Sequence, residues 1–144
     1  MSKININSRL IDKLEADLRN EFPHLTTERT ACSIRVLPNA ENGFVVELVD
    51  AIHEVVPSFG NWVIYGLDEK EAVPIFQAGL RGEARLHEIS RAGIAYHWNV
   101  EFLRNGAWIN EKNDYYSPPI FPGLFLFLNR KKERVLWNDP SRLT

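Results

Sequence analysis

Alternating hydrophobic and polar residues predict a β-hairpin over residues 93–110. The alternation of residues 96–102 places one set on each face of the first strand: Tyr96, Trp98, Val100 and Phe102 on the inner face, and His97, Asn99 and Glu101 on the outer face. The dipeptide Asn105-Gly106 favours a two-residue type I′ turn. A turn of that length predicts three cross-strand pairs, which are Phe102 with Ile109, Leu103 with Trp108 and Arg104 with Ala107.

The same alternation extends toward the N-terminus over residues 84–90, so we expect an antiparallel meander of strands 84–90, 94–103 and 107–113. An earlier hairpin is predicted from strands 31–37 and 44–49, with Arg35 and Glu47 on its outer face. Its inner face would carry Cys32, Ile34, Val36, Phe44, Val46 and Leu48. Residues 54–59 and 61–65 form either two short strands around Gly60 or one bent strand. Pro57 favours an edge or bulge there, because it lacks an amide donor.

Two helices are predicted by hydrophobic residues at steps of three and four. The first covers residues 6–22, is capped by Asn7 or Ser8, and ends before Pro23. The second covers residues 68–80 and begins with a capping box of Asp68 and Glu71. Pro74 conflicts with this helix, since it removes one hydrogen bond. Gly79 and Gly82 are predicted terminators.

The C-terminal third gives a weaker pattern. Residues 124–128, followed by charged residues and by 135–137, fit either a helix or a hairpin. We favour a strand for residues 124–128, because of their length and the proline and glycine residues before them. These elements together predict an α+β fold in which residues 1–144 form one domain, with the N-terminal helix and the 68–80 helix packed on an antiparallel sheet.

Charge and composition limit the classes of partner that we expect the chain to bind. The 144 residues carry a formal charge of −2, which gives no general attraction for nucleic acid or an anionic membrane. The one dense basic cluster, residues 130–134, is typical of a solvated turn or helix face. No window resembles a membrane span, and the single cysteine, Cys32, excludes an internal disulfide. We therefore expect a cytoplasmic protein that binds neither nucleic acid nor membrane.

Histidine chemistry is the basis of one functional hypothesis, a small enzyme or ligand-binding protein. His97 and Glu101 share a strand face but lie about 13 Å apart, too far to hold one metal ion. A two-residue turn at Ala92-Gly93 would place Glu88 opposite His97, and a three-residue turn would place His87 there instead. No nucleophile elbow or phosphate loop occurs in the sequence, so we expect no cofactor and no metal.

Tryptophans supply the second hypothesis, a protein-binding surface. Trp108 and Leu103, together with Trp62 or Trp137, are candidates for the outer face of the sheet. Either the two helices cover that face, which we favour, or it is an exposed apolar patch of the kind that marks protein interfaces. A free strand edge at 31–37 or 107–113 would in addition support a homodimer.

Residues 44–112 contain a pattern that resembles a group of small, largely uncharacterised bacterial proteins, some of them similar to immunity proteins of polymorphic or contact-dependent toxin systems. The pattern consists of Trp62, Asp68-Glu69-Lys70-Glu71-Ala72, Gly79-Leu80-Arg81-Gly82, Arg85-Leu86, Tyr96-x-Trp98-x-x-Glu101 and Gly106-x-Trp108. The resemblance implies a non-enzymatic protein that neutralises a cognate toxin by direct binding. Acidic and aromatic residues would form its interface, for which the candidates are Glu88, Glu101, Trp108, Glu111 and Asp114.

Overall fold

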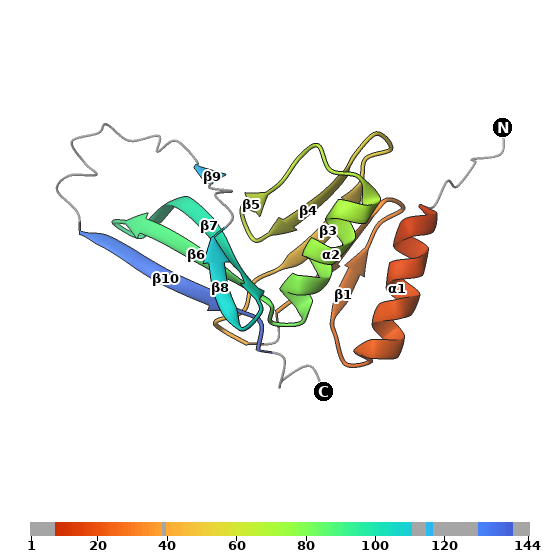
Figure 1. The fold of residues 1–144 in the computed structure, drawn as a ribbon, viewed down its shortest axis with the longest axis horizontal. Helices are drawn as coiled ribbons and strands as arrows, with labels where there is room; N and C mark the ends of the chain where they lie inside the picture. Colours follow the sequence, from red (N-terminus) through yellow and green to blue (C-terminus); the bar gives the residue numbers. More distant parts are fainter. Residues whose placement is uncertain (1–7, 39, 111–114, 117–129, 140–144) are drawn as a thin grey trace.

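Within the residues that the structure describes, the chain forms an α+β fold with the two predicted helices, but its strands make two antiparallel sheets where the sequence predicted one (Figure 1). The computed structural model describes residues 8–38, 40–110, 115–116 and 130–139. The first sheet has the order β1-β2-β3-β4-β5, with bounds Thr27–Arg29, Ser33–Val36, Val46–Asp50, Val55–Phe59 and Trp62–Val63. The second has the order β10-β6-β7-β8, and β9 also pairs with β7. Its bounds are Lys131–Trp137, Ala84–Arg91, Ile94–Arg104, Ala107–Asn110 and, for β9, Tyr115–Tyr116.

Both predicted helices form, with the predicted N-terminal caps. In α1 (Arg9–Glu21) the Ser8 hydroxyl accepts a hydrogen bond from the amide of Ile11, which is fully buried. In α2 (Glu69–Leu80) the capping box is complete. The Asp68 carboxylate accepts from the Glu71 amide at 2.9 Å, and the Glu71 carboxylate accepts from the Asp68 amide at 3.3 Å. Pro74 lies on the exposed side of α2, and the helix continues through it.

The two glycines near the end of α2 have different roles. Gly82 has a φ of +74° directly after the C-cap residue Arg81, which confirms it as a terminator. The prediction that Gly79 ends the helix is wrong, because Gly79 lies inside α2 and is buried. A Cβ atom on Gly79 would lie 2.5 Å from Cε1 of Phe59, so the absent side chain allows α2 to approach β4.

The hairpin of β2 and β3 has the expected faces, with one exception. Ile34, Val36, Phe44, Val46 and Leu48 are buried, and Arg35 lies 3.5 Å from Glu47 on the outer face. Cys32 is exposed rather than buried, because β2 begins only at Ser33. The edge proposed at 31–37 is also wrong, since β2 pairs with β1 on one side and β3 on the other.

β4 and β5 are separate strands around Gly60, whose φ is +56°. The Pro57 carbonyl accepts a hydrogen bond from the amide of Ile64, the residue that follows β5. The nitrogen of Pro57 therefore points toward the β5 side of β4, away from β3. In an antiparallel strand, the N–H and C=O of one residue point the same way. The missing amide therefore breaks no bond to β3, which explains how β4 accommodates a fully buried proline.

One hydrophobic core joins the two sheets through three aromatic rings. Trp62 of β5 stacks on Phe59 at a ring-centre distance of 5.1 Å, and each of these rings lies 6.3 Å from Phe102 of β7. Trp62 is fully buried. It therefore belongs to the core, and its assignment as an outer-face candidate is wrong.

Both helices lie against the first sheet. α2 contacts β3 and β4 and only marginally β6, while α1 lies beside β2 (Figure 1). The bidentate ion pair of Arg81 with Glu21 joins the two helices, and its hydrogen bonds raise the pKa of the Arg81 guanidinium above its ordinary value. Our expectation that the helices cover the outer face of the β6–β7–β8 meander is therefore wrong. In the described part of the chain, neither helix has the length and apolar character needed to cross a membrane.

Candidate functional site

The central hairpin places Trp108 on the outer face of the second sheet. Asn105 and Gly106 both have positive φ, at 51° and 78°, as the predicted type I′ turn requires. The observed pairs are the predicted ones: Phe102 with Ile109, Leu103 with Trp108 and Arg104 with Ala107. Trp108 is half-buried there and Leu103 lies beside it.

A β-bulge changes the register between β6 and β7. The turn has two residues, since Arg91 pairs with Ile94 and Ser90 with Ala95, but the next pair is Ile89 with His97. Tyr96 is the additional residue of β7. Both predicted partners of His97 are therefore wrong: Glu88 pairs with Trp98, and His87 pairs with Asn99.

Four charged or titratable side chains instead form a row across β7, β6 and β10. Arg85 Nη2 lies 3.1 Å from Glu101 Oε1, and the same carboxylate contacts Nε2 of His87. The other ring nitrogen of His87, Nδ1, lies 2.9 Å from Oε1 of Glu133. Both ring nitrogens of His87 thus contact carboxylates, one from β7 and one from β10. The row thereby links β10 to the two central strands.

Arg85 also holds Trp108. Its guanidinium carbon lies 4.0 Å from the centre of the Trp108 ring, which is the geometry of a cation–π interaction. Arg85 and Glu101 are direct partners in the β6–β7 register, so the positive charge over the ring already has a carboxylate beside it. The outer face at this point is consequently aromatic and close to neutral.

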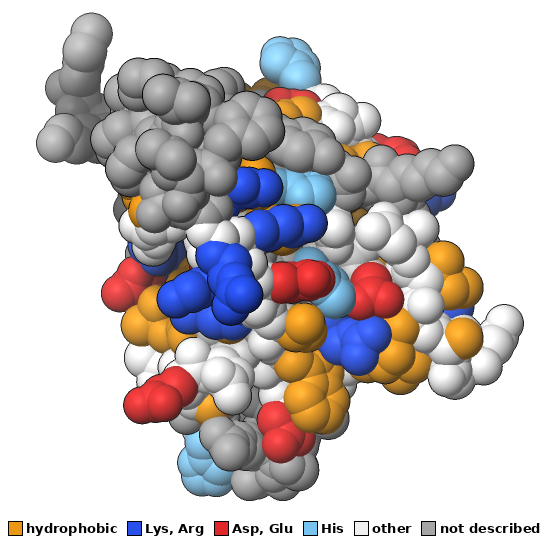
Figure 2. Space-filling model, turned by 90° about the vertical axis from the view of Figure 1, so that its left-hand side faces the viewer, with side chains coloured by type: hydrophobic (Ala, Val, Ile, Leu, Met, Phe, Trp, Pro, Cys, Tyr) orange, Lys and Arg blue, Asp and Glu red, His pale blue; other side chains and the backbone are white. Residues whose placement is uncertain are grey.

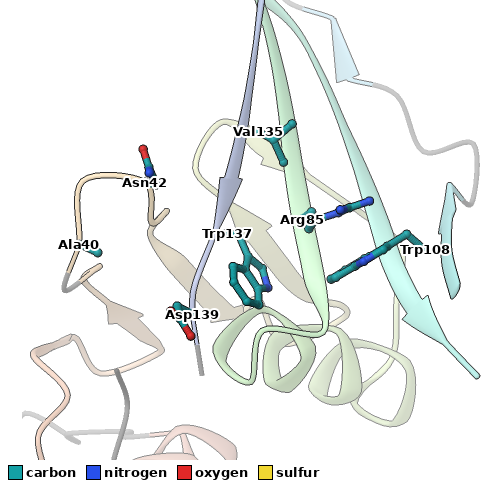
Figure 3. A pocket seen from close by; sticks show the side chains of 7 residues that line it. All are labelled: Ala40, Asn42, Arg85, Trp108, Val135, Trp137 and Asp139. Carbon is teal, nitrogen blue, oxygen red and sulfur yellow. The ribbon is translucent and has the colours of Figure 1, made fainter. Parts of the chain in front are cut away.

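A pocket of about 550 Å³ opens on this face (Figure 3). Trp108 and Trp137 lie on either side of the strand that carries Arg85, and the remaining lining residues are Ala40, Asn42, Val135 and Asp139. Figure 2 shows the side of the molecule where hydrophobic side chains lie next to a row of acidic, histidine and basic ones. We call this site the tryptophan pocket.

Backbone contacts fix the Trp137 side of the tryptophan pocket. The indole N–H donates to the Gly82 carbonyl at 2.8 Å, and the backbone amide of Trp137 donates to the Asn42 carbonyl at 2.7 Å. The next residue, Asn138, accepts from the Phe44 amide and donates to the carbonyls of Phe44 and Gly79. The end of β10 is thus held against both the loop before β3 and the end of α2.

The proposed interface residues do not all share one face. Trp108 and Glu101 lie together on the outer face, where both contact Arg85. Glu88 lies on the opposite face, where it accepts from Trp98 Nε1 at 3.1 Å and from Arg134 at 2.9 Å. Glu111 and Asp114 lie outside the described residues, as do residues 111–113 of the predicted third strand and residues 124–128.

Several residues of the site, among them Arg85, Val135 and Glu133, were not predicted from the sequence. Val135 lines the pocket, and residues 131–137 form a strand that pairs with β6, so 135–137 are not helical. The other half of the predicted helix or hairpin, residues 124–128, lies outside the described residues. Glu133 completes the row around His87, and no local pattern signals it, because its partner is 46 residues away in sequence. The outer position of Trp137 was one of two alternatives and is confirmed.

Among the described residues, no group of three histidine, cysteine or carboxylate side chains could hold a metal ion. In comparisons with known proteins, no family model matches the chain, and neither a curated protein nor a solved structure shows significant similarity to it.

Proposed function

We propose that this chain is a non-enzymatic protein-binding protein whose partner inserts a side chain into the tryptophan pocket. The observation that carries this proposal is the pair Trp108 and Trp137, which flank a pocket on a sheet face that neither helix covers. Tryptophan is among the residues that contribute most to binding energy at protein interfaces, since it combines large apolar area with few rotatable bonds.

The surroundings of the pocket favour an apolar or aromatic side chain as the inserted group. Arg85 and Glu101 neutralise each other at 3.1 Å, and Arg85 covers one ring rather than extending into solvent. Val135 and Trp137, with exposed fractions of 44% and 37%, continue the apolar surface along β10. Such a surface is suited to a partner's protruding side chain, because burying it removes apolar area from water on both molecules.

The specific form that we propose is an immunity protein that binds a cognate bacterial toxin. Its support is the resemblance in residues 44–112 together with this aromatic surface, which neither helix covers. The interface differs from the acidic patch first expected, because the carboxylate of Glu101 is already engaged by Arg85 and His87. Trp108 remains the principal anchor of the proposed interface. The second anchor is Trp137 rather than one of the acidic residues that the sequence indicated.

A co-purification experiment tests this proposal. The protein is co-expressed with the product of the adjacent gene, isolated at moderate salt, and compared with Trp108→Ala and Trp137→Phe. We expect a stoichiometric complex that Trp108→Ala weakens at least about tenfold, the scale of an interface hot spot. Trp137→Phe tests the second wall while keeping an aromatic ring.

Tyr65→Ala is the matched control, because Tyr65 is an aromatic residue with an exposed fraction of 67% and does not line the pocket. It should leave the complex unchanged. Thermal unfolding of each variant separates loss of binding from loss of folding. A complex that withstands both tryptophan substitutions would contradict the proposed site, and failure of the two proteins to associate would contradict the toxin as partner.

A further inference from the structure

Strand β10 forms one edge of the second sheet. Among the described residues it pairs with β6 alone, beside which it lies in Figure 1. The antiparallel register is unbroken over all seven residues, from Lys131 with Arg91 to Trp137 with Arg85. An edge of this length offers a row of backbone hydrogen-bonding groups to any extended chain that approaches it. The edge is adjacent to the tryptophan pocket, since Val135 and Trp137 belong to both.

The hydrogen bond of Trp137 shows which backbone groups of β10 point outward. Its amide donates to the Asn42 carbonyl rather than to β6. Outward and inward groups alternate along an antiparallel strand, so the N–H and C=O of Val135, Glu133 and Lys131 also point away from β6. Within the described ranges, these outward groups have no partner in the chain.

The side chains of the edge carry surplus positive charge. Arg134 is paired with Glu88, and Glu133 is paired with His87. Lys131 and Lys132 are exposed and have no carboxylate partner in the part of the chain that the structure describes. Basic side chains gather on the side of the molecule shown in Figure 2, although the chain as a whole has a formal charge of −2. Two copies of this edge would repel each other, whereas an acidic strand would be attracted.

We propose that β10 accepts an extended acidic segment of the partner protein, which adds a strand along residues 131–135. This inference rests on the proposed protein-binding function and specifies how the partner is held. Backbone hydrogen bonds from Lys131, Glu133 and Val135 supply the pairing, and side chains that alternate along the added strand supply the specificity.

The register of β10 determines the pattern of the added segment. Lys131 and Val135 share the outer face and are four residues apart, so the segment carries an acidic residue and an apolar residue at the same spacing, about 13 Å. The apolar residue lies beside Val135 at the rim of the tryptophan pocket. The pairing ends before Trp137, because Asn42 already occupies the outward amide of that residue.

Synthetic peptides test strand addition directly. The probe is an acetylated, amidated nonapeptide of alternating threonine and valine, in which a glutamate and a phenylalanine stand four positions apart. Binding to the full chain is followed by amide chemical shifts in NMR. We expect the largest shifts and new protection from hydrogen exchange at the amides of Lys131, Glu133 and Val135.

N-methylation of the peptide distinguishes strand addition from general adhesion. Two versions of the probe are methylated at alternate backbone nitrogens, one at odd and one at even positions. Only one set of nitrogens can face β10, so we expect one version to lose at least tenfold in affinity and the other to bind like the parent. Equal binding by both versions, or no amide shifts at millimolar peptide, would overturn the proposal.

Charge is tested by replacing the glutamate of the probe with lysine and by the variant Lys131→Ala, with Lys70→Ala as a control at an exposed lysine in α2. We expect Lys131→Ala and the lysine peptide each to weaken binding several-fold, and Lys70→Ala to have no effect. A lysine peptide that binds as well as the glutamate peptide would overturn the acidic assignment. Protection of the same three amides by dimer formation alone would show that the occupant is a second copy.

Binding of the whole partner and binding of the peptide together separate strand addition from the protein-binding function on which it rests. If the whole partner binds in a Trp108-dependent manner but leaves the amides of β10 unprotected, strand addition is wrong and the protein-binding function stands. If the partner does not bind at all while the acidic peptide still protects β10, the proposed partner is wrong and the edge remains a peptide-binding site.

Discussion

The guanidinium of Arg85 lies over the ring of Trp108, with 4.0 Å between its carbon and the ring centre. The two residues belong to β6 and β8, which are not neighbours in the sheet, so the Arg85 side chain passes across β7. Glu101 of β7 contacts the same guanidinium, with 3.1 Å between Arg85 Nη2 and Glu101 Oε1. The orientation of Trp108 in the pocket therefore depends on a residue from a strand two positions away.

We predict a measurable coupling between these two residues. In a double-mutant cycle of Arg85→Ala and Trp108→Ala, the coupling free energy of unfolding should be about 0.5–1 kcal/mol, the range of an exposed cation–π pair. Urea unfolding of the four proteins measures it. The pair Arg85 and Tyr65 provides the control cycle and should be additive. Additivity in the Arg85–Trp108 cycle would show that the stacking has no energetic role.

Gly79→Ala should destabilise the protein by about 1–3 kcal/mol, because the added methyl group meets the ring of Phe59. The sign of this stability change distinguishes a tightly packed glycine from an unconstrained one. At an unconstrained helix position the same substitution stabilises by up to about 1 kcal/mol. Thermal and urea unfolding measure the change, and Phe59→Leu in the same chain should reduce the loss. A more stable Gly79→Ala variant would mean that α2 does not need this close approach.

Pro74→Ala should stabilise the protein, because it restores an amide donor for the carbonyl of Lys70 in the middle of α2 and removes the ring beside that carbonyl. The expected gain is about 1–3 kcal/mol in the free energy of unfolding, since proline is the least favourable residue in a helix interior. Lys70→Ala changes no backbone bond and should stay within about 0.5 kcal/mol of the parent. An unchanged or lower stability of Pro74→Ala would indicate that the proline ring packs favourably.

Asn138→Ala should cost about 1–3 kcal/mol and loosen the end of β10. The substitution leaves the part-buried amide of Phe44 and the Gly79 carbonyl without their partner at 3.0 Å. Asn42→Ala is the matched control, because Asn42 contributes its backbone carbonyl and not its side chain to Trp137. Faster hydrogen exchange at Trp137 in Asn138→Ala alone would support this role, and equal exchange in both variants would contradict it.

The sequence predicted the elements whose cause is local. The cap at Ser8, the capping box at Asp68 and the turn at Asn105-Gly106 each depend on residues within a few positions, and all three are confirmed. Predictions were wrong where one residue's environment depends on a distant strand. The prediction that Gly79 ends α2 is wrong for this reason, since its neighbour Phe59 is 20 positions away. The prediction for Cys32 is wrong for a local reason, since β2 begins one residue later.

The relationships within the candidate site also divide into those with a local cause and those that depend on distant strands. The amino-acid sequence by itself determined that Trp108 stands on the outer face of a hairpin opposite Leu103, because turn length and alternation fix cross-strand pairs. Only the tertiary structure decided that the bulge at Tyr96 separates His97 from its expected partners, that Arg85 reaches Trp108, and that Trp137 forms the second wall of the pocket. These relationships join strands far apart in sequence, and they arise from packing two sheets around one core, which no local pattern encodes.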